Sequence, residues 1–155
     1  MAELQPWMPW CHPGYSIDDS RSWLETQVPA FEQGTAFEFA IVSADQQYLG
    51  GCGLNQIDTI NQRANLGYWV RTSAARRGVA TGAVRALRDW AFQHTGLIRL
   101  EVVVAVGNAQ SQRVAVKAGA DLEGVLKNRV LLFGVVHDAT MFSFTRTVAA
   151  PARMA

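Results

Sequence analysis

The sequence predicts one domain of mixed α/β class, built on a sheet that combines parallel and antiparallel strands. Short segments rich in β-branched and aromatic residues, bounded by turn residues, recur along the chain. A stretch with helical spacing of its apolar residues separates two of these segments, which requires a crossover connection. A length of 155 residues and a hydrophobic content of 49% suit a single core. We expect the domain to cover residues 1–148 and residues 149–155 to form a flexible tail.

The composition favours a soluble, cytoplasmic protein without nucleic-acid or membrane partners. A net charge of +1 leaves no broad basic surface for nucleic acid. The apolar runs are far shorter than the ~20 residues that span a membrane, and the first residues lack the pattern of a signal peptide. Cys11 and Cys52 show no Cys-x-x-Cys spacing, so we interpret them as free thiols in a reducing compartment. The histidines and cysteines have no metal-site spacing, and no metal is expected.

The first part of the chain predicts an irregular loop followed by a helix. Residues 6–14 contain three prolines and a glycine, which interrupt any regular element. Trp7 and Trp10 in this loop either cap the core or form one wall of a substrate cleft. The next residues contain a capping box, and we expect a helix from there to about Val28 that buries two apolar side chains. The capping residues are Ser16 and Asp19, and the buried side chains are Trp23 and Leu24.

The remaining elements are predicted from alternation, apolar runs and glycines. We expect strands over residues 37–42, 48–57, 63–70, 98–106, 122–133 and 135–145. The first two form a hairpin, the last two pair around Gly134, and the strongly apolar strand 98–106 is central. Gly50, Gly51 and Gly53 suggest a bulge or a close neighbour in the second strand. A short helix runs from its N-cap Asn108 to Gly119.

Residues 66–95 read as a strand, an arginine-rich turn and an amphipathic helix. The helix carries Ala80, Val84, Leu87 and Ala91 on one face. The first N–H groups of a helix lack internal partners and carry partial positive charge, so the segment from Gly78 to Thr81 could bind a diphosphate. Three arginines in the turn would add charge: Arg71, Arg76 and Arg77. The alternative is an ordinary surface turn with solvated arginines, because neither of the best-known phosphate-loop motifs is present.

Several short motifs occur in order at suitable spacing. They are Gly67-Tyr-Trp-Val, Arg77-Gly-Val-Ala-Thr, Asn108-Ala-Gln-Ser111 continuing to Gly119, Leu122-Glu-Gly124, and His137-Asp138. Together they resemble the GNAT superfamily of acetyl-CoA-dependent N-acetyltransferases, and within it the Rim-type enzymes that acetylate the N-termini of ribosomal proteins. The resemblance covers about residues 64–145.

The chain departs from this family at a few positions. The phosphate signature falls on residues 75–80, where Ala75 replaces a glutamine or arginine, Arg76 stands where a glycine is usual, and Gly82 replaces a frequent glutamate. The usual first strand and helix are not seen before the tryptophan loop. Either that strand is lost, which leaves a sheet edge to be covered, or the natural start lies upstream.

The resemblance implies acetyl-CoA as cosubstrate and assigns site residues. The diphosphate would bind the amides and arginines at positions 76–81, that is, Arg76, Arg77, Gly78, Val79, Ala80 and Thr81. Arg71 or Arg76 would bind the remaining phosphate, and a main-chain N–H of Trp69 or Val70 would polarise the thioester carbonyl. Asn108 and Ser111 would lie beside the cofactor arm, with Ser111 protonating the departing thiolate. Alternatively, these last two residues only cap a helix.

The general base and the acceptor stay open at the level of the sequence. The glutamate that Rim-type enzymes are thought to use corresponds to Val130 here. The available carboxylates are Glu38, Glu101, Glu123 and Asp58, while Asp138 is interpreted as structural. The expected function is acetyl transfer to a protein N-terminus. The alternatives are acetylation of a small amine and coenzyme A binding without turnover, and a homodimer is compatible with all three.

Overall fold

A single six-stranded sheet with three helices makes up the computed structural model of the protein, which describes residues 4–147. The elements follow in the order α1 (Ile17–Gln33), β1 (Phe37–Val42), β2 (Tyr48–Asp58), β3 (Arg63–Val70), a 3-10 turn η1 (Thr72–Ala74), α2 (Val79–His94), β4 (Arg99–Ala105), α3 (Ala109–Ala118), β5 (Asp121–Leu132) and β6 (Val135–Thr145). All six predicted strands and all three predicted helices are present. The predicted tail at residues 149–155 lies outside the described residues.

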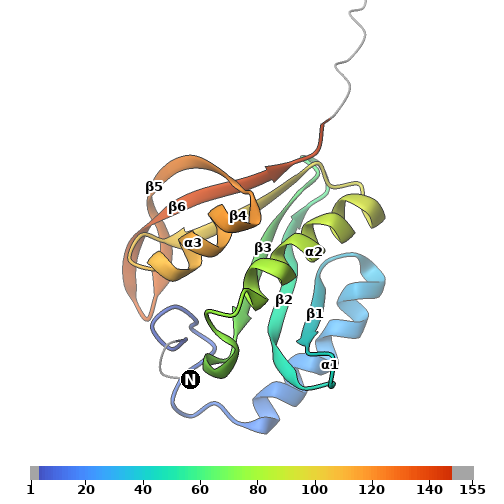
Figure 1. Cartoon of the computed structure of the whole chain (residues 1–155), viewed down its shortest axis with the longest axis vertical. Coiled ribbons are helices and arrows are strands. Elements are labelled where there is room, and N and C mark those ends of the chain that lie inside the picture. Colours follow the sequence, from blue (N-terminus) through green and yellow to red (C-terminus); the bar gives the residue numbers. More distant parts are fainter. Residues whose placement is uncertain (1–3, 148–155) are drawn as a thin grey trace, which may run out of the picture.

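The sheet has the strand order β1-β2-β3-β4-β6-β5 (Figure 1). Its one parallel pair is β3 with β4, which α2 connects as a crossover, and the other neighbours are antiparallel. This confirms the predicted mixed sheet. Strand β4 lies between β3 and β6 and is almost fully buried, as its apolar sequence predicts. Strand β1 is one edge of the sheet.

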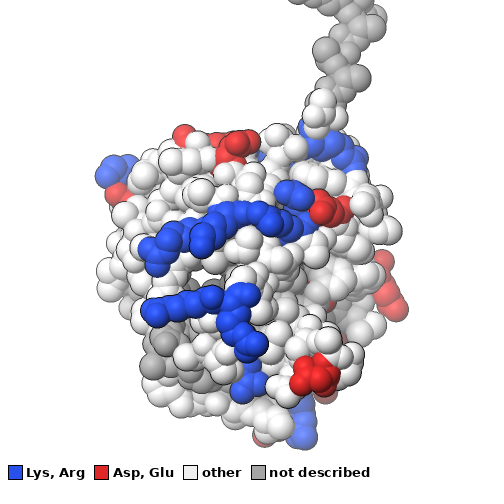
Figure 2. All heavy atoms as spheres, viewed as in Figure 1, with Lys and Arg blue, Asp and Glu red and all other residues white. Residues whose placement is uncertain are grey.

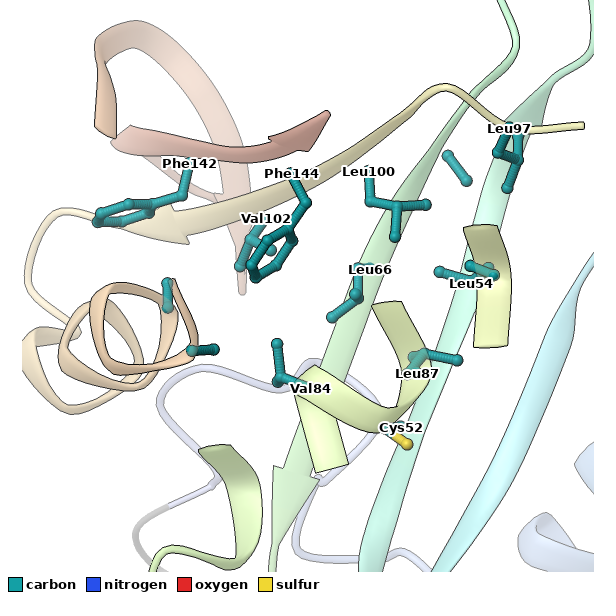
Figure 3. Close-up of a cluster of buried hydrophobic side chains, with 14 of the residues drawn as sticks. Cys52, Leu54, Leu66, Val84, Leu87, Leu97, Leu100, Val102, Phe142 and Phe144 are labelled. Carbon is teal, nitrogen blue, oxygen red and sulfur yellow. The ribbon is translucent and has the colours of Figure 1, made fainter. Parts of the chain in front are cut away.

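The three helices share one face of the sheet. Phe37 and Phe39 are two residues apart on β1 and therefore point to the same face. Both contact Trp90 of α2 and Phe31 of α1, with ring centroids 4.8 to 6.2 Å apart. The buried core between sheet and helices is shown in Figure 3. It combines alternate residues of the central strands with one stripe of each of α2 and α3; its members include Leu54, Leu66, Val84, Leu87, Leu100, Val102, Ala115 and Phe142.

Helix α1 differs from the sequence prediction in length and in burial. It continues through Pro29 and ends at Gly34, whose φ of 68° allows a left-handed cap. Its capping box is confirmed, but Trp23 and Leu24 are 49% and 57% exposed. The predicted burial is therefore wrong. Phe31, in the last turn of the helix, supplies the ring contacts to the sheet and α2. The side chains of Trp23 and Leu24, in the middle of the helix, lie outside the core.

The glycines of β2 have close neighbours, as expected. A Cβ on Gly50 would lie 2.2 Å from the main-chain oxygen of Trp69, and one on Gly53 would lie 2.0 Å from a carboxylate oxygen of Glu38. The bulge in this hairpin is in the register between Ile41 and Val42. A side chain at Gly50 would therefore require the strand pair to shift, whereas one at Gly53 would require the Glu38 side chain to move.

The cysteines and the lengths of the helices are two further features of the described residues. Cys11 and Cys52 are both buried and form no disulfide. Among residues 4–147, no helix is long and apolar enough to cross a membrane.

Candidate active site

Strands β3 and β4 separate after a short paired segment. Their ladder consists of the pairs Arg63 with Arg99, Ala64 with Leu100 and Asn65 with Glu101. Both strands continue beyond it, β3 to Val70 and β4 to Ala105, without further pairing to each other. The gap lies at their carboxyl ends, from which the chain passes on to α2 and α3 (Figure 1). Carboxyl ends of parallel strands are where α/β sheets commonly bind ligands.

The N–H of Val70 points into this gap. Arg71 donates its N–H to the carbonyl of Leu49 on β2, with the two atoms 2.8 Å apart. In an antiparallel pair the main-chain groups of successive residues point to opposite sides, and the register from Asn65 to Val70 has no irregularity. Trp69 therefore directs its N–H toward β2, whereas Val70 directs its N–H toward the gap. Of the two predicted donors, Val70 is therefore the one whose N–H faces the gap.

The turn between β3 and α2 is the segment for which the sequence predicts an anion site. Gly78 is the N-cap of α2 and has a φ of 80°, and Arg76 has a φ of 60°. At the start of the helix, Gly82 donates its N–H to the carbonyl of Gly78 at 2.9 Å. The N–H groups of Val79, Ala80 and Thr81 therefore belong to the unpaired first turn. No acidic residue lies in that turn. The space beside Gly78 is open, since a Cβ there would meet no atom within 4 Å.

The arginines predicted for this site are not equivalent. Arg76 and Arg77 are exposed in the turn before α2. Arg71 instead donates through its guanidinium to the carbonyl of Tyr48, 3.2 Å away at the start of β2. Figure 2 shows Lys and Arg side chains in bands across the face that carries α2 and α3, with acidic side chains mostly toward its margins. Positive side chains therefore predominate over the middle of this face.

The start of α3 holds Asn108 and Ser111 as predicted. The side-chain oxygen of Asn108 accepts the N–H of Ser111 at 3.1 Å, so Asn108 is a helix cap. The hydroxyl of Ser111 contacts the hydroxyl of Tyr68 on β3 at 2.9 Å. The Tyr68 hydroxyl also donates to the main-chain carbonyl of Ser111, again at 2.9 Å. Burial raises the pKa of Tyr68 to about 12, while its bond to Ser111 acts in the opposite direction.

Tyr68 is the site residue that sequence reasoning missed. It stands in the Gly67-Tyr-Trp-Val motif, which predicts a strand and main-chain donors but indicates no role for the phenol. Strand alternation could have indicated its direction, because Leu66 and Tyr68 point to the same, helix-covered face.

The tryptophan loop lies next to this end of the sheet. The ring of Trp10 contacts that of Trp69 at the end of β3, with centroids 5.3 Å apart. Trp7 lies against the turn between β4 and α3, because a Cβ on Gly107 would be 3.1 Å from its ring. Trp10 is 37% exposed, so this loop borders the site and keeps part of its aromatic surface open to solvent.

Most of the carboxylates considered as bases are paired with cations. Glu101 lies 3.0 Å from Arg63 and 2.9 Å from Arg99, and Asp58 lies 3.3 Å from Arg63. Glu123 binds Arg99 and the hydroxyl of Ser143, and these bonds lower its pKa to about 2. Each of these groups joins neighbouring segments of the chain.

Two other candidates occupy different environments. Asp138 accepts from the ammonium of Lys127 at 2.7 Å and from the N–H of Asn128 at 3.0 Å, which fits its expected structural role. These bonds also lower the pKa of Asp138. Glu38 has no ion pair within residues 4–147, and burial raises its pKa. Its carboxylate lies against Gly53 of β2. Gly53 pairs with Gly67 of β3, which is three residues before Val70. No candidate metal cluster of histidine, cysteine and carboxylate side chains is found among residues 4–147.

The family follows from comparison with known proteins. A family model described as the acetyltransferase (GNAT) domain matches residues 1–121. The chain is a GNAT acetyltransferase. It is 30% identical over 140 residues to the ribosomal-protein-serine acetyltransferase of Escherichia coli (strain K12), a match that covers 90% of this chain and 78% of the relative.

Solved structures of related proteins have the same fold. A protein from Vibrio cholerae described as a ribosomal-protein-serine acetyltransferase matches with a TM-score of 0.80 and 26% identity, over 92% of this chain and 80% of that one. RimJ of Mycobacterium smegmatis, solved in complex with CoA-disulfide, matches with a TM-score of 0.83 and 25% identity, over 93% and 71% of the two chains. As a member of this family, the GNAT acetyltransferase described here uses acetyl-CoA as its acetyl donor.

Proposed function

We propose that this GNAT acetyltransferase transfers the acetyl group of acetyl-CoA to the N-terminal amine of a protein, as the names of its ribosomal-protein relatives describe for them. The observation that carries the proposal is the separation of β3 from β4 after three paired positions, with the N–H of Val70 facing the gap. A thioester in this gap would have its carbonyl oxygen beside a fixed donor. Such a donor stabilises the negative charge that develops during acyl transfer.

The start of α2 would hold the diphosphate of the coenzyme. Unpaired N–H groups at Val79, Ala80 and Thr81 face a turn without acidic residues, and the helix dipole adds partial positive charge there. Arg76 and Arg77 lie in the same turn and are exposed, so they are free to add charge-assisted bonds. Among residues 4–147, Arg76 has no bond comparable to that of Arg71 with Tyr48, so it is the better candidate for the remaining phosphate.

The chemical step requires a proton for the leaving sulfur. The acceptor nitrogen forms a bond to the acetyl carbon, the carbonyl oxygen gains charge beside the Val70 N–H, and the carbon–sulfur bond then breaks. Ser111 donates its hydroxyl proton to the departing sulfur, and the acceptor nitrogen loses one proton to water. That proton returns to the Ser111 oxygen, so the reaction consumes none. Ser111 suits this role because it lies in the first turn of α3 and contacts Tyr68 on β3, next to the gap.

No dedicated base is required for an N-terminal amine. The reference pKa of an α-amino group is roughly 8, so an unprotonated fraction exists at neutral pH. Glu101, Glu123, Asp58 and Asp138 are bound to cations. We propose that the amine loses its proton to a water molecule.

The charge around the site supports a peptide acceptor over a polycationic small molecule. Asp138, on β6 beside the carboxyl end of β4, is neutralised by Lys127, and burial of Glu38 raises its pKa and so disfavours its charged form. A site that selects a polyamine would present unpaired carboxylates instead. With a ribosomal-protein acceptor, the proposed compartment is the cytoplasm.

The test is thiol release from acetyl-CoA with a panel of acceptors. The panel contains peptides with free N-termini, the same peptides with N-terminal acetyl groups, free lysine and a polyamine. We expect turnover only with free N-termini, and mass spectrometry should locate the acetyl group on the α-nitrogen. Acetylation of the polyamine or of lysine side chains alone would contradict the proposed acceptor, and absence of turnover with every amine would support a protein that only binds the coenzyme.

A further inference from the structure

The phenol of Tyr68 makes two contacts with one residue of a distant element. Its oxygen lies 2.9 Å from the Oγ of Ser111 and 2.9 Å from the main-chain oxygen of Ser111. The two residues are 43 positions apart in the sequence, one on β3 and one on α3. Two equal distances mean that the phenol hydrogen can be directed to either oxygen with little movement of the ring.

The direction of that hydrogen decides what Ser111 can do. A hydroxyl has a single proton to donate. When Tyr68 donates to the carbonyl, its oxygen is an acceptor for Ser111, and the serine proton points to the phenol. When Tyr68 donates to Oγ, the serine proton is free to point elsewhere, including into the gap between β3 and β4.

An isolated serine is also a poor source of a proton. Once its hydroxyl has protonated a thiolate, an alkoxide remains, and an aliphatic alcohol is a far weaker acid than a phenol, whose reference pKa is about 10. Within residues 4–147, Tyr68 is the titratable side chain that contacts this hydroxyl. Tyr68 is half-buried, and its raised pKa keeps the phenol protonated at neutral pH.

We propose that Tyr68 is a positioning residue that turns the Ser111 hydroxyl toward the leaving sulfur and replaces the proton that Ser111 gives up. This inference rests on the proposed function. In the step, the Ser111 O–H bond breaks as the S–H bond forms, and the Tyr68 O–H bond breaks as a new Ser111 O–H bond forms. The phenolate then takes a proton from water, which received one from the acceptor amine. The overall reaction therefore consumes no proton.

The test compares single-turnover rates of Tyr68→Phe, Ser111→Ala and the double variant, with acetyl-CoA and the best acceptor of the panel. Tyr68→Phe removes the hydroxyl and keeps the ring. We expect it to lower the rate at least about tenfold, within the range of general acid catalysis, and to leave the dissociation constant of acetyl-CoA within about twofold. The double variant should be as slow as Ser111→Ala alone, because the tyrosine acts through the serine. Tyr48→Phe is the matched control, since its ring contacts Trp69 at the end of the same strand β3, while among residues 4–147 it is the hydroxyl of Tyr68 that contacts Ser111.

Three results would overturn the inference. One is an unchanged rate in Tyr68→Phe. Another is a weaker binding of acetyl-CoA with an unchanged rate, which would make the pair a structural link only. The third is a double variant whose single-turnover rate is lower than that of Ser111→Ala by the same factor that Tyr68→Phe alone causes. If Tyr68→Phe proves unstable, all the variants are compared at a lower temperature at which it stays folded, by the same three criteria. Failure of the proposed function is distinguishable, because the unmodified enzyme would then acetylate no free N-terminus.

Discussion

Arg99 of β4 binds both carboxylate oxygens of Glu123 on β5, with nitrogen–oxygen distances of 2.7 and 2.5 Å. The same guanidinium contacts Glu101 on its own strand, and Glu123 in turn accepts the hydroxyl of Ser143 on β6. One arginine therefore connects β4 to β5 across β6, on the side of the sheet opposite the helices. A charge-assisted, bidentate pair of this kind fixes geometry as well as adding stability.

Glu123→Gln should lower the free energy of unfolding by about 1 kcal/mol at neutral pH, a modest value because the pair is partly exposed. The bonds to Arg99 and Ser143 lower the pKa of Glu123 from 4.5 to about 2. The stabilisation is therefore complete above pH 4.5 and is lost as the pH falls toward 2. Urea unfolding of both proteins at several pH values checks this. Glu25→Gln is the control, at an exposed residue with no ion pair among residues 4–147, and it should show no such pH-dependent difference. A constant difference for Glu123→Gln across this pH range would contradict stabilisation by the ionised carboxylate.

Gly78→Glu should weaken acetyl-CoA binding at least tenfold, because it adds a negative charge at the start of α2 where the diphosphate is proposed to bind. The φ of 80° at this position adds a backbone cost of about 1–2 kcal/mol to any larger residue. Gly78→Asn is the control, since asparagine tolerates this φ and carries no charge. Calorimetry should find the asparagine variant much closer to the unmodified protein. Equal affinities for the two variants would remove the diphosphate from this turn.

Arg76→Gly should raise the free energy of unfolding by up to about 1 kcal/mol. Arg76 has a φ of 60°, which glycine adopts without a steric cost. The same change at Arg77, which is not among the residues with positive φ, should not stabilise. Thermal unfolding compares the two. If Arg76 also binds a phosphate of the coenzyme, Arg76→Gly will weaken acetyl-CoA binding while it raises the melting temperature, a combination that a purely structural arginine would not give.

Phe31→Ala should destabilise the protein by about 1–2 kcal/mol, whereas Leu24→Ala should change stability by less than about 0.5 kcal/mol. Phe31 contacts the rings of Phe37, Phe39 and Trp90. Leu24 is 57% exposed, and alanine is at least as good a helix former as leucine. Chemical denaturation measures both. A large loss for Leu24→Ala would mean that this side of α1 is covered in solution.

The sequence is sufficient for the strands, the crossover and the turn before α2, because each depends on local alternation, spacing or glycine. It is insufficient for α1, since apolar spacing shows that Leu24 lies on one side of a helix but not whether anything packs there. The choice of Val70 over Trp69 required the register with β2. The contact of Tyr68 with Ser111 required the packing of α3 against β3, which no local pattern contains.

The short ladder between β3 and β4 also has a dynamic consequence. Beyond Asn65 and Glu101, the amides that face the gap have no strand partner, so they should exchange their hydrogens with solvent more rapidly than the paired amides of β2 and β6. A bound thioester arm would occupy the place of the missing strand. Deuterium uptake at Tyr68 and Val70, measured with and without coenzyme, would then report site occupancy independently of any acceptor.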